Sequence, residues 1–295
     1  MAVVTTGFFD GVHIGHRKVI KSLCETARSR GEKSIVVTFW PHPRNILRQD
    51  ADKLRLLTSL QEKKDMLKEL GVDEIVIVDF TREFSRLTAK EFVQNYLIGK
   101  FSAKLLVVGY DHRLGRSVEG EKNDILEIAD SVGIEAFRVG ALTEGEHTIS
   151  STVIRNLIET GNIEKANSLL GYNYPLLGVV VSGKKIGRTI GFPTANMQLY
   201  EPLKLVPEKG VYAVKVDVEG KRYNGICNIG CRPTVDNSER ITIETHILDF
   251  DEIIYGLDIR VEFVCRIRDE IKFNTLDDLK AQLEIDKKKA KEILK

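Results

Sequence analysis

The hydrophobic pattern of this chain changes character near residue 172, and this change constrains the possible folds more than any single motif. Before that point, continuous apolar runs alternate with segments whose apolar residues recur at helical spacing. After it, apolar and polar residues alternate with a period of two, between turns rich in Gly and Pro. Because 295 residues also lie past the usual size of one hydrophobic core, we expect two domains, residues 1–172 and 173–295.

The first domain is expected to have an α/β fold built on a doubly wound parallel sheet. Short continuous apolar runs predict strands at Ala2–Thr6, Ser34–Phe39, Glu74–Asp79, Lys104–Gly109 and Ile134–Val139. Amphipathic helices are predicted between them at Gly15–Arg30, Ser59–Gly71, Thr88–Ile98 and Glu121–Val132. This alternation is typical of a parallel sheet covered on both faces. Ligands of such sheets bind beyond the carboxyl ends of the strands, so the loops after Thr6, Phe39 and Gly109 are candidate sites.

The second half is expected to form a small antiparallel β-barrel. Period-two segments predict strands that include Leu177–Val181, Val211–Val218, Tyr223–Ile229, Arg240–Leu248 and Ile259–Arg268. Two helices, Ser151–Thr160 and Ile163–Leu170, are predicted just before this pattern begins, and Glu219-Gly220 has the composition of a hairpin turn. An amphipathic helix over Thr275–Leu294 is expected to close the chain. Its candidate inward residues are Leu276, Leu279, Leu283, Ala290 and Leu294.

Charge and composition argue against several classes of partner. A formal net charge of +1 gives no overall field that would attract nucleic acid or an acidic membrane. No stretch approaches the roughly 18 apolar residues of a membrane-spanning helix, and the N-terminus lacks the basic start of a signal peptide. The four cysteines lack zinc-type spacing, so we interpret them as reduced thiols. We expect a cytoplasmic monomer or weak homo-oligomer that acts on small molecules, with no nucleic-acid or membrane partner.

The segment GFFDGVHIGH, residues 7–16, follows the first predicted strand and opens the first predicted helix. Its glycines allow a tight turn, and the helix N-terminus directs backbone N–H groups at an anion. His13 and His16 flank a glycine, so both imidazoles can donate hydrogen bonds to triphosphate oxygens as charge builds at the α-phosphorus. In an alternative interpretation, one histidine caps the helix and the other is a surface residue.

GFFDGVHIGH resembles the H-x-G-H signature of the nucleotidyltransferase superfamily, and its F-D-G-V-H is similar to the FAD synthetase branch. Further matches follow in order, with TFWPHP at 38–43, VVGYD at 107–111 and ISSTVIR at 149–155. In that family these segments surround ATP and the flavin nucleotide. The resemblance makes His13 and His16 catalytic. The ATP-binding residues that it implies are Gly7, Phe8, Asp10, Gly11, His13, His16, Asp111, Ser151 and Arg155.

The chain departs from this family pattern in two places. Phe8 stands where the family usually has Asn, and residues 111–115 read DHRLG where it has D-F-x-F-G. His112 and Leu114 therefore replace two phenylalanines, which leaves open the residues that line the adenine and flavin pockets. Considered without the family, Ser150 or Ser151 can cap the helix that follows, and Arg155, one turn on, can return to the same phosphate.

A second motif, GRTIGFPTAN at residues 187–196, combines two glycines, a proline-fixed turn and the side-chain oxygens of Thr194 and Asn196. Neutral oxygen ligands suit a Mg²⁺ ion that keeps most of its waters and bridges nucleotide phosphates. The same residues equally fit a turn in which both side chains bond their own backbone. A nearby G-x-x-x-x-G-K match at residues 178–184 is rejected as a P-loop, because its interior is a run of valines and Lys185 replaces the required Ser or Thr.

GRTIGFPTAN is similar to the riboflavin kinase signature, and GVYAV at 210–214, NIGCRPTV at 228–235 and ETHILDF at 244–250 follow in family order. The resemblance implies a six-stranded Greek-key barrel with a C-terminal helix. It makes Glu244 the general base for the ribityl 5′-hydroxyl, and it places Mg²⁺ at Thr194 and Asn196. The implied ATP-binding residues are Gly187, Thr194 and Asn196, and the implied flavin-binding residues are Gly191, Phe192, Pro193, Thr194 and Arg266. Without the family, Glu244 is ambiguous, because a glutamate on a polar strand face is usually solvated.

Together the two resemblances cover nearly the whole chain, in the order of the bacterial bifunctional riboflavin kinase/FAD synthetase family. They imply that the barrel transfers the γ-phosphate of ATP to riboflavin, giving FMN and ADP. The first domain then joins FMN to the α-phosphorus of a second ATP, giving FAD and pyrophosphate. One alternative is an adenylyl- or cytidylyltransferase for another small phosphate, with the barrel as a binding module. A second, an RNA-binding barrel, is disfavoured because no arginine-rich face accompanies Tyr212, Tyr223 and Phe263.

Overall fold

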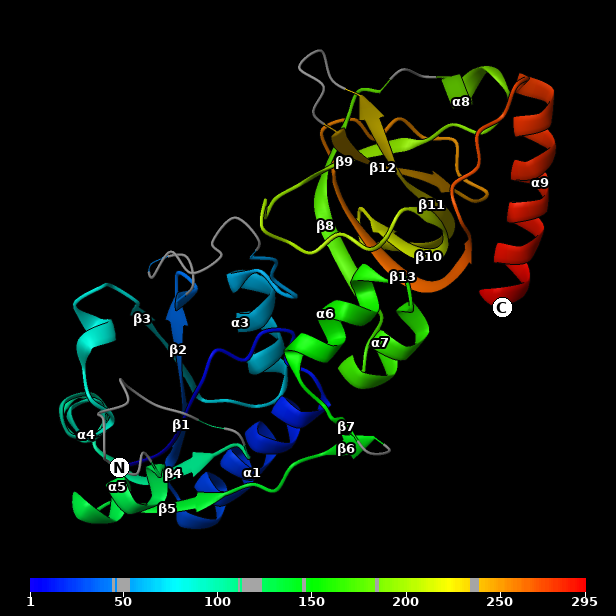
Figure 1. Ribbon diagram of the computed structural model, residues 1–295. Coiled ribbons are helices and arrows are strands. Elements are labelled where there is room, and N and C mark those ends of the chain that lie inside the picture. The colour runs from blue at the N-terminus through cyan, green and yellow to red at the C-terminus, as the bar shows by residue number, and fades with distance from the viewer. Residues whose placement is uncertain are drawn as a thin grey trace. The chain divides into compact units, whose positions relative to one another are not determined.

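The computed structural model describes residues 1–43, 46, 54–110, 112, 124–144, 147–183, 186–233 and 239–295. The chain forms two compact units, Met1–Ser151 and Thr152–Lys295 (Figure 1). The first contains a sheet with helices, and the second a closed barrel with helices. None of the helices in the described ranges combines the length and the hydropathy that crossing a bilayer requires. Each unit is described separately.

The first unit contains the predicted parallel sheet. Its strands are β1 (Ala2–Thr6), β2 (Lys33–Trp40), β3 (Glu74–Asp79), β4 (Ala103–Val108) and β5 (Glu135–Arg138), in the order β3-β2-β1-β4-β5. All four pairings are parallel, and Val4 is in register with Ile35 on one side and Leu106 on the other. The chain therefore winds outward in both directions from β1, so the doubly wound fold is confirmed. A two-stranded ribbon, β6 (Thr143–Glu144) and β7 (His147–Thr148), follows β5.

The sheet is buried on both faces, which explains its continuous apolar strands. On one face, Val3, Val36 and Leu105 pack with α1 (Ile14–Arg30) and with Leu67 of α3 (Leu60–Glu69). On the other face, alternate residues of the same strands pack with α4 (Ala89–Phe92), η3 (Val93–Ile98) and α5 (Ile125–Ser131). Alternate side chains of a strand point to opposite faces, so each apolar run supplies both cores.

Two predicted helices differ in detail. The one expected over Thr88–Ile98 is a single α-helical turn, α4, followed by the π-helical segment η3; a short 3₁₀ turn, η2 (Phe84–Arg86), precedes it. The helix expected over Glu121–Val132 begins, within the described residues, at Ile125 with Asp124 as its N-cap. Periodicity in sequence indicates a helical segment but does not distinguish hydrogen bonds to the fourth residue from those to the fifth.

The second unit is a closed six-stranded barrel, as the resemblance implies. Its strands are β8 (Tyr174–Val181), β9 (Ala195–Leu199), β10 (Gly210–Val218), β11 (Lys221–Pro233), β12 (Glu239–Ile247) and β13 (Asp258–Arg268), in the order β10-β11-β12-β9-β8-β13. Every described pairing is antiparallel. Glu219 (φ 49°) and Gly220 (φ 73°) form the predicted hairpin turn between β10 and β11, because both central residues of such a turn need positive φ.

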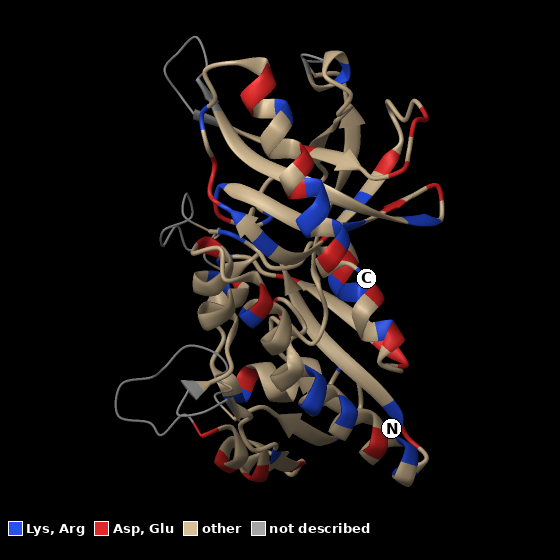
Figure 2. Cartoon of the chain, turned by 90° about the vertical axis from the view of Figure 1, so that its right-hand side faces the viewer, with Lys and Arg blue, Asp and Glu red and all other residues tan. Residues whose placement is uncertain are grey.

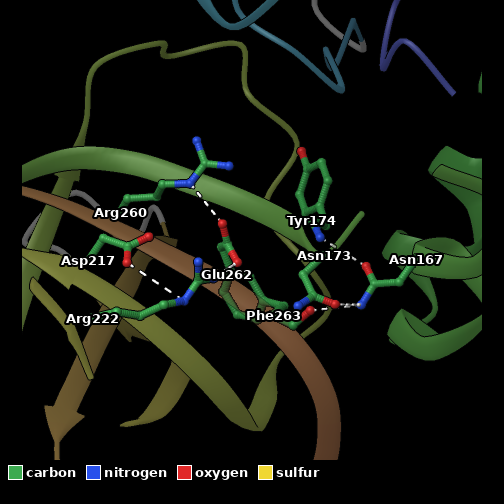
Figure 3. Close-up of polar contacts among 8 residues, drawn as sticks. All are labelled: Asn167, Asn173, Tyr174, Asp217, Arg222, Arg260, Glu262 and Phe263. Atoms are coloured by element: carbon green, nitrogen blue, oxygen red, sulfur yellow. Dashed lines mark hydrogen bonds and ion pairs between the residues drawn. The ribbon is translucent and has the colours of Figure 1, made fainter. Parts of the chain in front are cut away.

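The compact units divide between Ser151 and Thr152, ahead of the boundary that we expect at residue 172. Helices α6 (Ser151–Glu159) and α7 (Ile163–Leu170) lie between these two positions. Figure 3 shows Asn167 of α7 joined to the barrel: its side-chain amide donates to the carbonyl of Phe263 (2.8 Å), and its amide oxygen accepts from the N–H of Tyr174 (2.9 Å). The hydrophobic pattern thus locates the change from helices to strands. The packing contacts, by contrast, place α7 in the same unit as the barrel strands.

Ion pairs line the outer surface of the barrel beside this joint. Glu262 of β13 accepts from Arg260 (3.0 Å) and pairs with Arg222, whose Nε lies 3.7 Å from Asp217 (Figure 3). Lys residues are interspersed with Asp and Glu along the helix that ends at the C label in Figure 2. Exposed ion pairs of this kind contribute little to stability. The mixture of positive and negative side chains agrees with the near-zero net charge of the sequence.

The C-terminal helix α9 (Leu276–Ile293) covers one side of the barrel. Ala290 and Leu294 are buried against it, while Leu279 and Leu283 are half-buried. The prediction that Leu276 points inward is wrong, because this first residue of the helix is 54% exposed. A fully buried acid, Asp286, was not among the predicted inward residues; it is paired with Arg268 of β13 at 2.7 Å.

Candidate active sites

The segment between β1 and α1 has an unusual backbone. Phe9 (φ 48°), Gly11 (φ 80°) and Val12 (φ 36°) all have positive φ, a region that suits glycine but strains other residues, particularly the β-branched ones. Strained backbone persists only where surrounding contacts hold it, and it is concentrated at functional sites. The predicted glycine turn is therefore present. Phe9 and Val12 also adopt positive φ, although they lack the conformational freedom of glycine.

Asp10 anchors this strained loop. Its buried carboxylate accepts hydrogen bonds from the N–H of Leu57 (3.1 Å) and from both the N–H (3.0 Å) and the hydroxyl (3.1 Å) of Thr58. The Thr58 hydroxyl oxygen accepts, in turn, from the N–H of Gly11 (3.1 Å). Asp10 is only 3% exposed, and these bonds let it support the loop; its expected contact with ATP stays a prediction.

His13 and His16 form a stacked pair at the start of α1. Their ring centroids lie 3.6 Å apart and their planes differ by 19°. His13 is the N-cap, and its Nδ1 accepts from the N–H of His16 (3.3 Å). A Cβ atom on Gly15 would lie 3.1 Å from the His13 ring, so glycine makes room for the stack. One histidine does cap the helix, but neither is a surface residue: His13 is buried and His16 half-buried.

The surroundings of His16 keep its imidazole neutral. Burial, followed by the nearby His13 and Lys63, lowers the pKa of His16 well below its ordinary value of 6.5. Its Nδ1 is buried and has no hydrogen-bond partner in the described part of the chain. A neutral imidazole still carries one N–H. At neutral pH His16 can therefore donate a hydrogen bond, but it holds no second proton to give away.

A cavity of about 120 Å³ lies at the carboxyl ends of the strands, where the sheet topology predicts a ligand. It is lined by residues from the start of α1 and from the segments after β4 and β5: His13, Gly15, His16, Val19, Gly109, Tyr110, Val139, Gly140, Ala141, Leu142, Thr148, Ile149, Ser150 and Ser151. The Ser151 hydroxyl donates to the carbonyl of Asp10 (2.9 Å). The structure thus brings His13, His16 and Ser151 together around one space.

Of the other ATP-binding residues expected in this half, the described Gly7, Phe8, Asp10 and Gly11 do not line the cavity. Gly7 donates its N–H to the carbonyl of Val37 (3.1 Å). The Phe8 ring contacts that of His42, with centroids 4.1 Å apart. Arg155 lies one turn beyond Ser151 on α6, within the second unit. Asp111 and Leu114 lie outside the described residues, so their predicted roles stay predictions.

Two cavities lined by described residues of the second unit, of about 290 and 370 Å³, lie on either side of strand β12. Glu244 and His246, on one face of this strand, line the larger cavity. Thr245 and Ile247, on the other face, line the smaller one. This division follows from the period of two in a strand. Thr194 lines both cavities, so it marks the point at which molecules bound in the two would meet.

The two cavities differ in chemistry. The larger is mostly apolar and aromatic, lined by Ile190, Phe192, Val211, Ile226, Ile271, Phe273, Leu279 and Leu283 with Gly187, Asn228, Arg268 and Glu270. The smaller is lined by Val180, Gly183, Arg188, Pro193, Ala195, Asn196 and the segment Phe250–Tyr255. An apolar slot with few polar groups suits a planar ring system. In the smaller cavity, Arg188 and the neutral oxygens of Thr194 and Asn196 suit phosphate, whereas the carboxylates of Asp251 and Glu252 would repel it.

The GRTIGFPTAN segment is bent into a fixed loop. It begins with α8 (Ile186–Thr189), after which the N–H of Phe192 donates to the carbonyl of Gly187 (2.8 Å). A Cβ atom on Gly187 would lie only 2.2 Å from the Phe192 oxygen, so no other residue permits this closure. His246 Nδ1 lies 2.8 Å from the carbonyl of Pro193, a hydrogen bond that ties the loop to β12.

Strand pairing assembles the residues expected to act in the barrel. Asn196 of β9 is in register with Glu244 of β12. The Thr194 hydroxyl donates to the Glu244 carboxylate at 3.5 Å. Glu244 is half-buried at the wall of the larger cavity, so it is not a solvated surface glutamate. Asn196 belongs to a strand and lines the smaller cavity, which argues against the interpretation that it only stabilises a turn.

Two family models match this chain, FAD synthetase over residues 1–153 and riboflavin kinase over residues 170–294. The chain is 40% identical to the bifunctional riboflavin kinase/FMN adenylyltransferase of Bacillus subtilis, over 98% of its own length and 91% of the relative's. The Escherichia coli K12 protein of the same name is also 40% identical, over 98% of this chain and 92% of that protein. The chain belongs to the bifunctional riboflavin kinase/FMN adenylyltransferase family.

A crystal structure described as a macrolide-efflux protein from Streptococcus pneumoniae has the same fold as this family member. The TM-score is 0.91, with 34% identity over 98% of this chain and 93% of that one. Its description names a different activity from the two family models and from the relatives above. This comparison therefore shows the shared fold, and the activity in that description applies to that protein alone.

Within the riboflavin kinase half, the residues expected to bind flavin are only partly together. Phe192 and Thr194 line the larger cavity, and Pro193 lines the smaller one. Gly191 and Arg266 line neither. Arg266 instead donates to the carbonyl of Lys209 (2.6 Å) and pairs with Asp269 (2.9 Å). Arg268, two positions on, lines the larger cavity, and the flavin-binding role expected of Arg266 stays a prediction.

Sequence reasoning missed two residues at the larger cavity. His246 was visible as a polar residue two positions from Glu244, on the strand face that also contains Thr242, because period two places them on one face. Arg268 could not be found by the same rule, because a register shift pairs Arg266 with Tyr212 and Arg268 with Val211, which lie on opposite faces of β10. All four cysteines are free thiols, and only Cys227 is buried. Burial raises the pKa of Cys227 to about 12, so this thiol is unreactive at neutral pH.

Proposed function

We propose that the two reactions of this family are divided between the two units, with FMN adenylylation at the histidine pair and riboflavin phosphorylation in the barrel. Family membership assigns conversion of riboflavin to FMN and FAD to the chain. The division is supported by one observation above all. Each unit has its own cavity beside its own phosphate-binding motif, and each motif falls within the matching family model.

In the barrel, riboflavin occupies the larger cavity and ATP the smaller one. The isoalloxazine ring lies among the apolar and aromatic side chains, and the ribityl chain extends toward Thr194, which lines both cavities. Glu244 accepts the proton of the ribityl 5′-hydroxyl as that oxygen bonds to the γ-phosphorus of ATP. The bond from the γ-phosphorus to the bridging oxygen breaks, so FMN and ADP are the products.

The donor set in the barrel fits Mg²⁺. Asn196 and Thr194 offer neutral side-chain oxygens at the mouth of the smaller cavity, the ligand type that Mg²⁺ accepts alongside water and phosphate. Asn196 is packed so closely on Gly183 that a Cβ there would lie 2.4 Å from its amide nitrogen, which fixes its side chain. In the described part of the chain, no cluster of three or more His, Cys, Asp or Glu is placed to hold a metal. The ion, bound with nucleotide, would neutralise phosphate charge.

In the first unit, a phosphate oxygen of FMN attacks the α-phosphorus of ATP, and the bond to the bridging oxygen of pyrophosphate breaks. No general base is needed, because the attacking phosphate is already ionised at neutral pH. His13 and His16 donate hydrogen bonds to oxygens whose negative charge increases during the reaction. The lowered pKa of His16 supports this assignment, since a neutral imidazole is a donor and a poor acid.

We further propose that the protein works in the cytoplasm as a monomer or weak homo-oligomer. Free cysteines, both buried and half-buried, are consistent with a reducing compartment. Sedimentation of the purified protein across a tenfold or larger concentration range would test the oligomeric state. A stable dimer at low concentration would contradict this part of the proposal.

The decisive experiment is a time course with riboflavin, Mg²⁺ and ATP labelled either at the γ- or at the α-phosphorus. Label from the γ-position should enter FMN first and then FAD. Label from the α-position should enter FAD alone. Removal of Mg²⁺ by a chelator should stop FMN formation. Appearance of α-label in FMN, or of FAD without prior FMN, would contradict the assignment of the two reactions.

A further inference from the structure

Lys63 is a buried cation that the proposed mechanism does not use. It lies in the first turn of α3, and its side chain is 0% exposed. Its ammonium lies 4.0 Å from the centroid of the Phe8 ring. Nζ has no hydrogen-bond partner among the residues that the structure describes. Lysines are almost never fully buried unless they are paired, and an unpaired buried charge destabilises a fold.

The position of Lys63 in the helix makes this burial more unusual. Leu67, one turn later on the same face, is also 0% exposed and belongs to the core beneath the sheet. Residues four apart share a helix face, so an apolar residue would suit position 63. The chain instead has a lysine at this core position, although a methionine would pack there equally well.

A second buried nitrogen without a partner lies close to the first. His16 Nδ1 is buried and has no hydrogen-bond partner in the described ranges. The charge on Lys63 contributes to the lowered pKa of His16, which shows that the two groups are electrostatically close. Phe8, under the Lys63 ammonium, belongs to the same strained segment that leads into the histidine pair. Two unsatisfied nitrogens, from separate elements, therefore lie at one end of the adenylylation site.

The neighbouring carboxylates are engaged with backbone groups. Asp10 accepts from Leu57 and Thr58, and Glu62 accepts from the N–H of Ser59 (2.6 Å). The titratable groups that face Lys63 are Asp10 on the loop after β1, His13 and His16 at the start of α1, His42 across the Phe8 ring, and Glu62 on its own helix. None of these is hydrogen-bonded to the ammonium.

We propose that Lys63 is the buried positive charge of the adenylylation site, which stabilises the reacting phosphates of ATP and FMN through the histidine pair. This inference rests on the proposed function of the first unit. Coulomb interactions are much stronger in a buried site than in water, so a buried ammonium acts on bound phosphates without a surface contact. Lys63 is thus a positioning residue, and its positive charge stabilises the negative charge of the departing pyrophosphate.

The proposal gives two pH dependences of opposite sign. Burial lowers the pKa of Lys63 from 10.5 to about 8, so the ammonium form is lost from the free enzyme above that pH. The kcat/KM for adenylylation, which reports on the free enzyme, should therefore fall above about pH 8. The unfolded chain binds more protons between pH 8 and 10.5 than the folded one. Stability of the first unit should therefore rise over that window as activity falls.

The test compares Lys63→Met with Lys68→Met, a matched change at an exposed lysine of the same helix. FAD formation from FMN and Mg-ATP is followed from pH 6.5 to 9.5, together with thermal unfolding. FMN formation from riboflavin in the same samples is the internal control. We expect Lys63→Met to lower adenylylation kcat/KM by about 10- to 100-fold, at or below the loss for one directly placed donor. Its alkaline decline should disappear, and its melting temperature should equal or exceed that of the wild type.

The outcomes separate this inference from the function on which it rests. One outcome is that the wild type forms FAD, while Lys63→Met keeps an adenylylation kcat/KM within threefold of the wild-type value and shows the same alkaline decline. Lys63 then has no electrostatic role. If the wild type forms no FAD from FMN, the proposed function fails and the inference falls with it. If Lys63→Met does not fold, the wild-type profile decides, because a flat kcat/KM between pH 7 and 9.5 would overturn the proposal. Lys63→Arg, which keeps its charge at high pH, should retain activity across that range.

Discussion

The two proposed sites are built by opposite structural means. The proposed adenylylation site surrounds a buried, strained loop whose backbone Asp10 holds. Lys63 of α3 and His16 of α1 add nitrogens that have no hydrogen-bond partner among the described residues. The kinase site uses regular strands, and its residues become neighbours through the pairing of β9 with β12. The first arrangement costs stability, whereas the second costs little because its functional side chains line open cavities.

This difference implies different responses to mutation. In a buried site, functional and structural roles are combined in the same residues, so a substitution changes activity and stability together. In a strand-built site, a side chain that lines a cavity can be changed without disturbing the ladder behind it. The following predictions test that contrast, in order of decreasing effect.

The largest effect is expected for Glu244→Gln. Loss of the general base should lower riboflavin phosphorylation by about 10²- to 10⁴-fold, while FAD formation from supplied FMN stays within twofold. Because Glu244 is half-buried at a cavity wall, stability should change by less than about 0.5 kcal/mol. Steady-state assays of each half-reaction and denaturant unfolding measure these quantities. Loss of both reactions together would show that the sites are not separate.

A smaller effect is expected for His13→Ala, which should lower adenylylation by about 10²- to 10³-fold and leave the kinase intact. His13 also caps α1, so the alanine variant should lose about 1 kcal/mol of stability as well. His13→Asn is the matched control, since asparagine can cap the helix but offers no imidazole. Normal stability with low adenylylation in the asparagine variant would assign the activity to the ring. Recovery of activity would assign it to the cap.

The contrast also explains how much of each site could be predicted from the sequence. The histidine pair was predictable because its members are three residues apart, and the helix that places them follows from local pattern. Thr194 and Glu244 are fifty residues apart, and only the family resemblance joined them, because strand β9 is short and was not among the predicted strands. Register between distant strands is set by packing of the whole barrel, which no local pattern contains.

Three further residues, Arg266, Arg268 and Lys63, show where local rules fail. Arg266 and Arg268 would share one face of a regular strand, but a register shift pairs Arg266 with Tyr212 and Arg268 with Val211, on opposite faces. Of the two, Arg268 lines the cavity. Lys63 lies in the polar run QEKKD, where nothing marks it as the member that points inward. Burial of a charge contradicts the hydrophobic pattern on which sequence prediction depends. Residues of this kind are found from the structure.

A third prediction concerns the C-terminal helix. Asp286 is fully buried and accepts from Arg268 Nε (3.0 Å) and Nη2 (2.7 Å), which fixes Arg268 at the larger cavity. Asp286→Leu should raise the KM for riboflavin by about tenfold, with a smaller change in kcat. It should also cost up to about 3 kcal/mol, because the remaining arginine loses its partner in a partly buried site. Asp286→Asn, which keeps hydrogen-bond acceptance, should lie between this variant and the wild type.

Unchanged riboflavin KM in Asp286→Leu would show that the position of α9 does not govern the flavin cavity. A matched control is Asp278→Asn at the exposed start of the same helix, which should leave the KM for riboflavin within twofold. If both variants raise KM equally, the effect belongs to the helix as a whole and not to the ion pair.

The smallest effect is expected at His246, whose bond to the Pro193 carbonyl joins the GRTIGFPTAN loop to β12. His246→Phe keeps a ring against Phe192, where the two centroids now lie 5.0 Å apart, but removes the donor. Loss of one neutral hydrogen bond, about 1 kcal/mol, should raise the KM values of the kinase by roughly fivefold. His246→Gln, which retains a donor, should have a smaller effect on the same measurement.

The charge state of His246 adds a pH test to this comparison. Burial lowers the pKa of His246 below 6.5, with the bond to Pro193 opposing this shift, and Lys287, Asp249 and Glu284 are the charged groups that face it. The unfolded chain therefore binds the proton more readily, so the contribution of His246 to stability is complete above pH 6.5 and declines as the pH falls below it. Barrel stability in the wild type should decrease below pH 6.5 more steeply than in His246→Phe. Parallel decreases in the two proteins would show that the loop is held by contacts other than this imidazole.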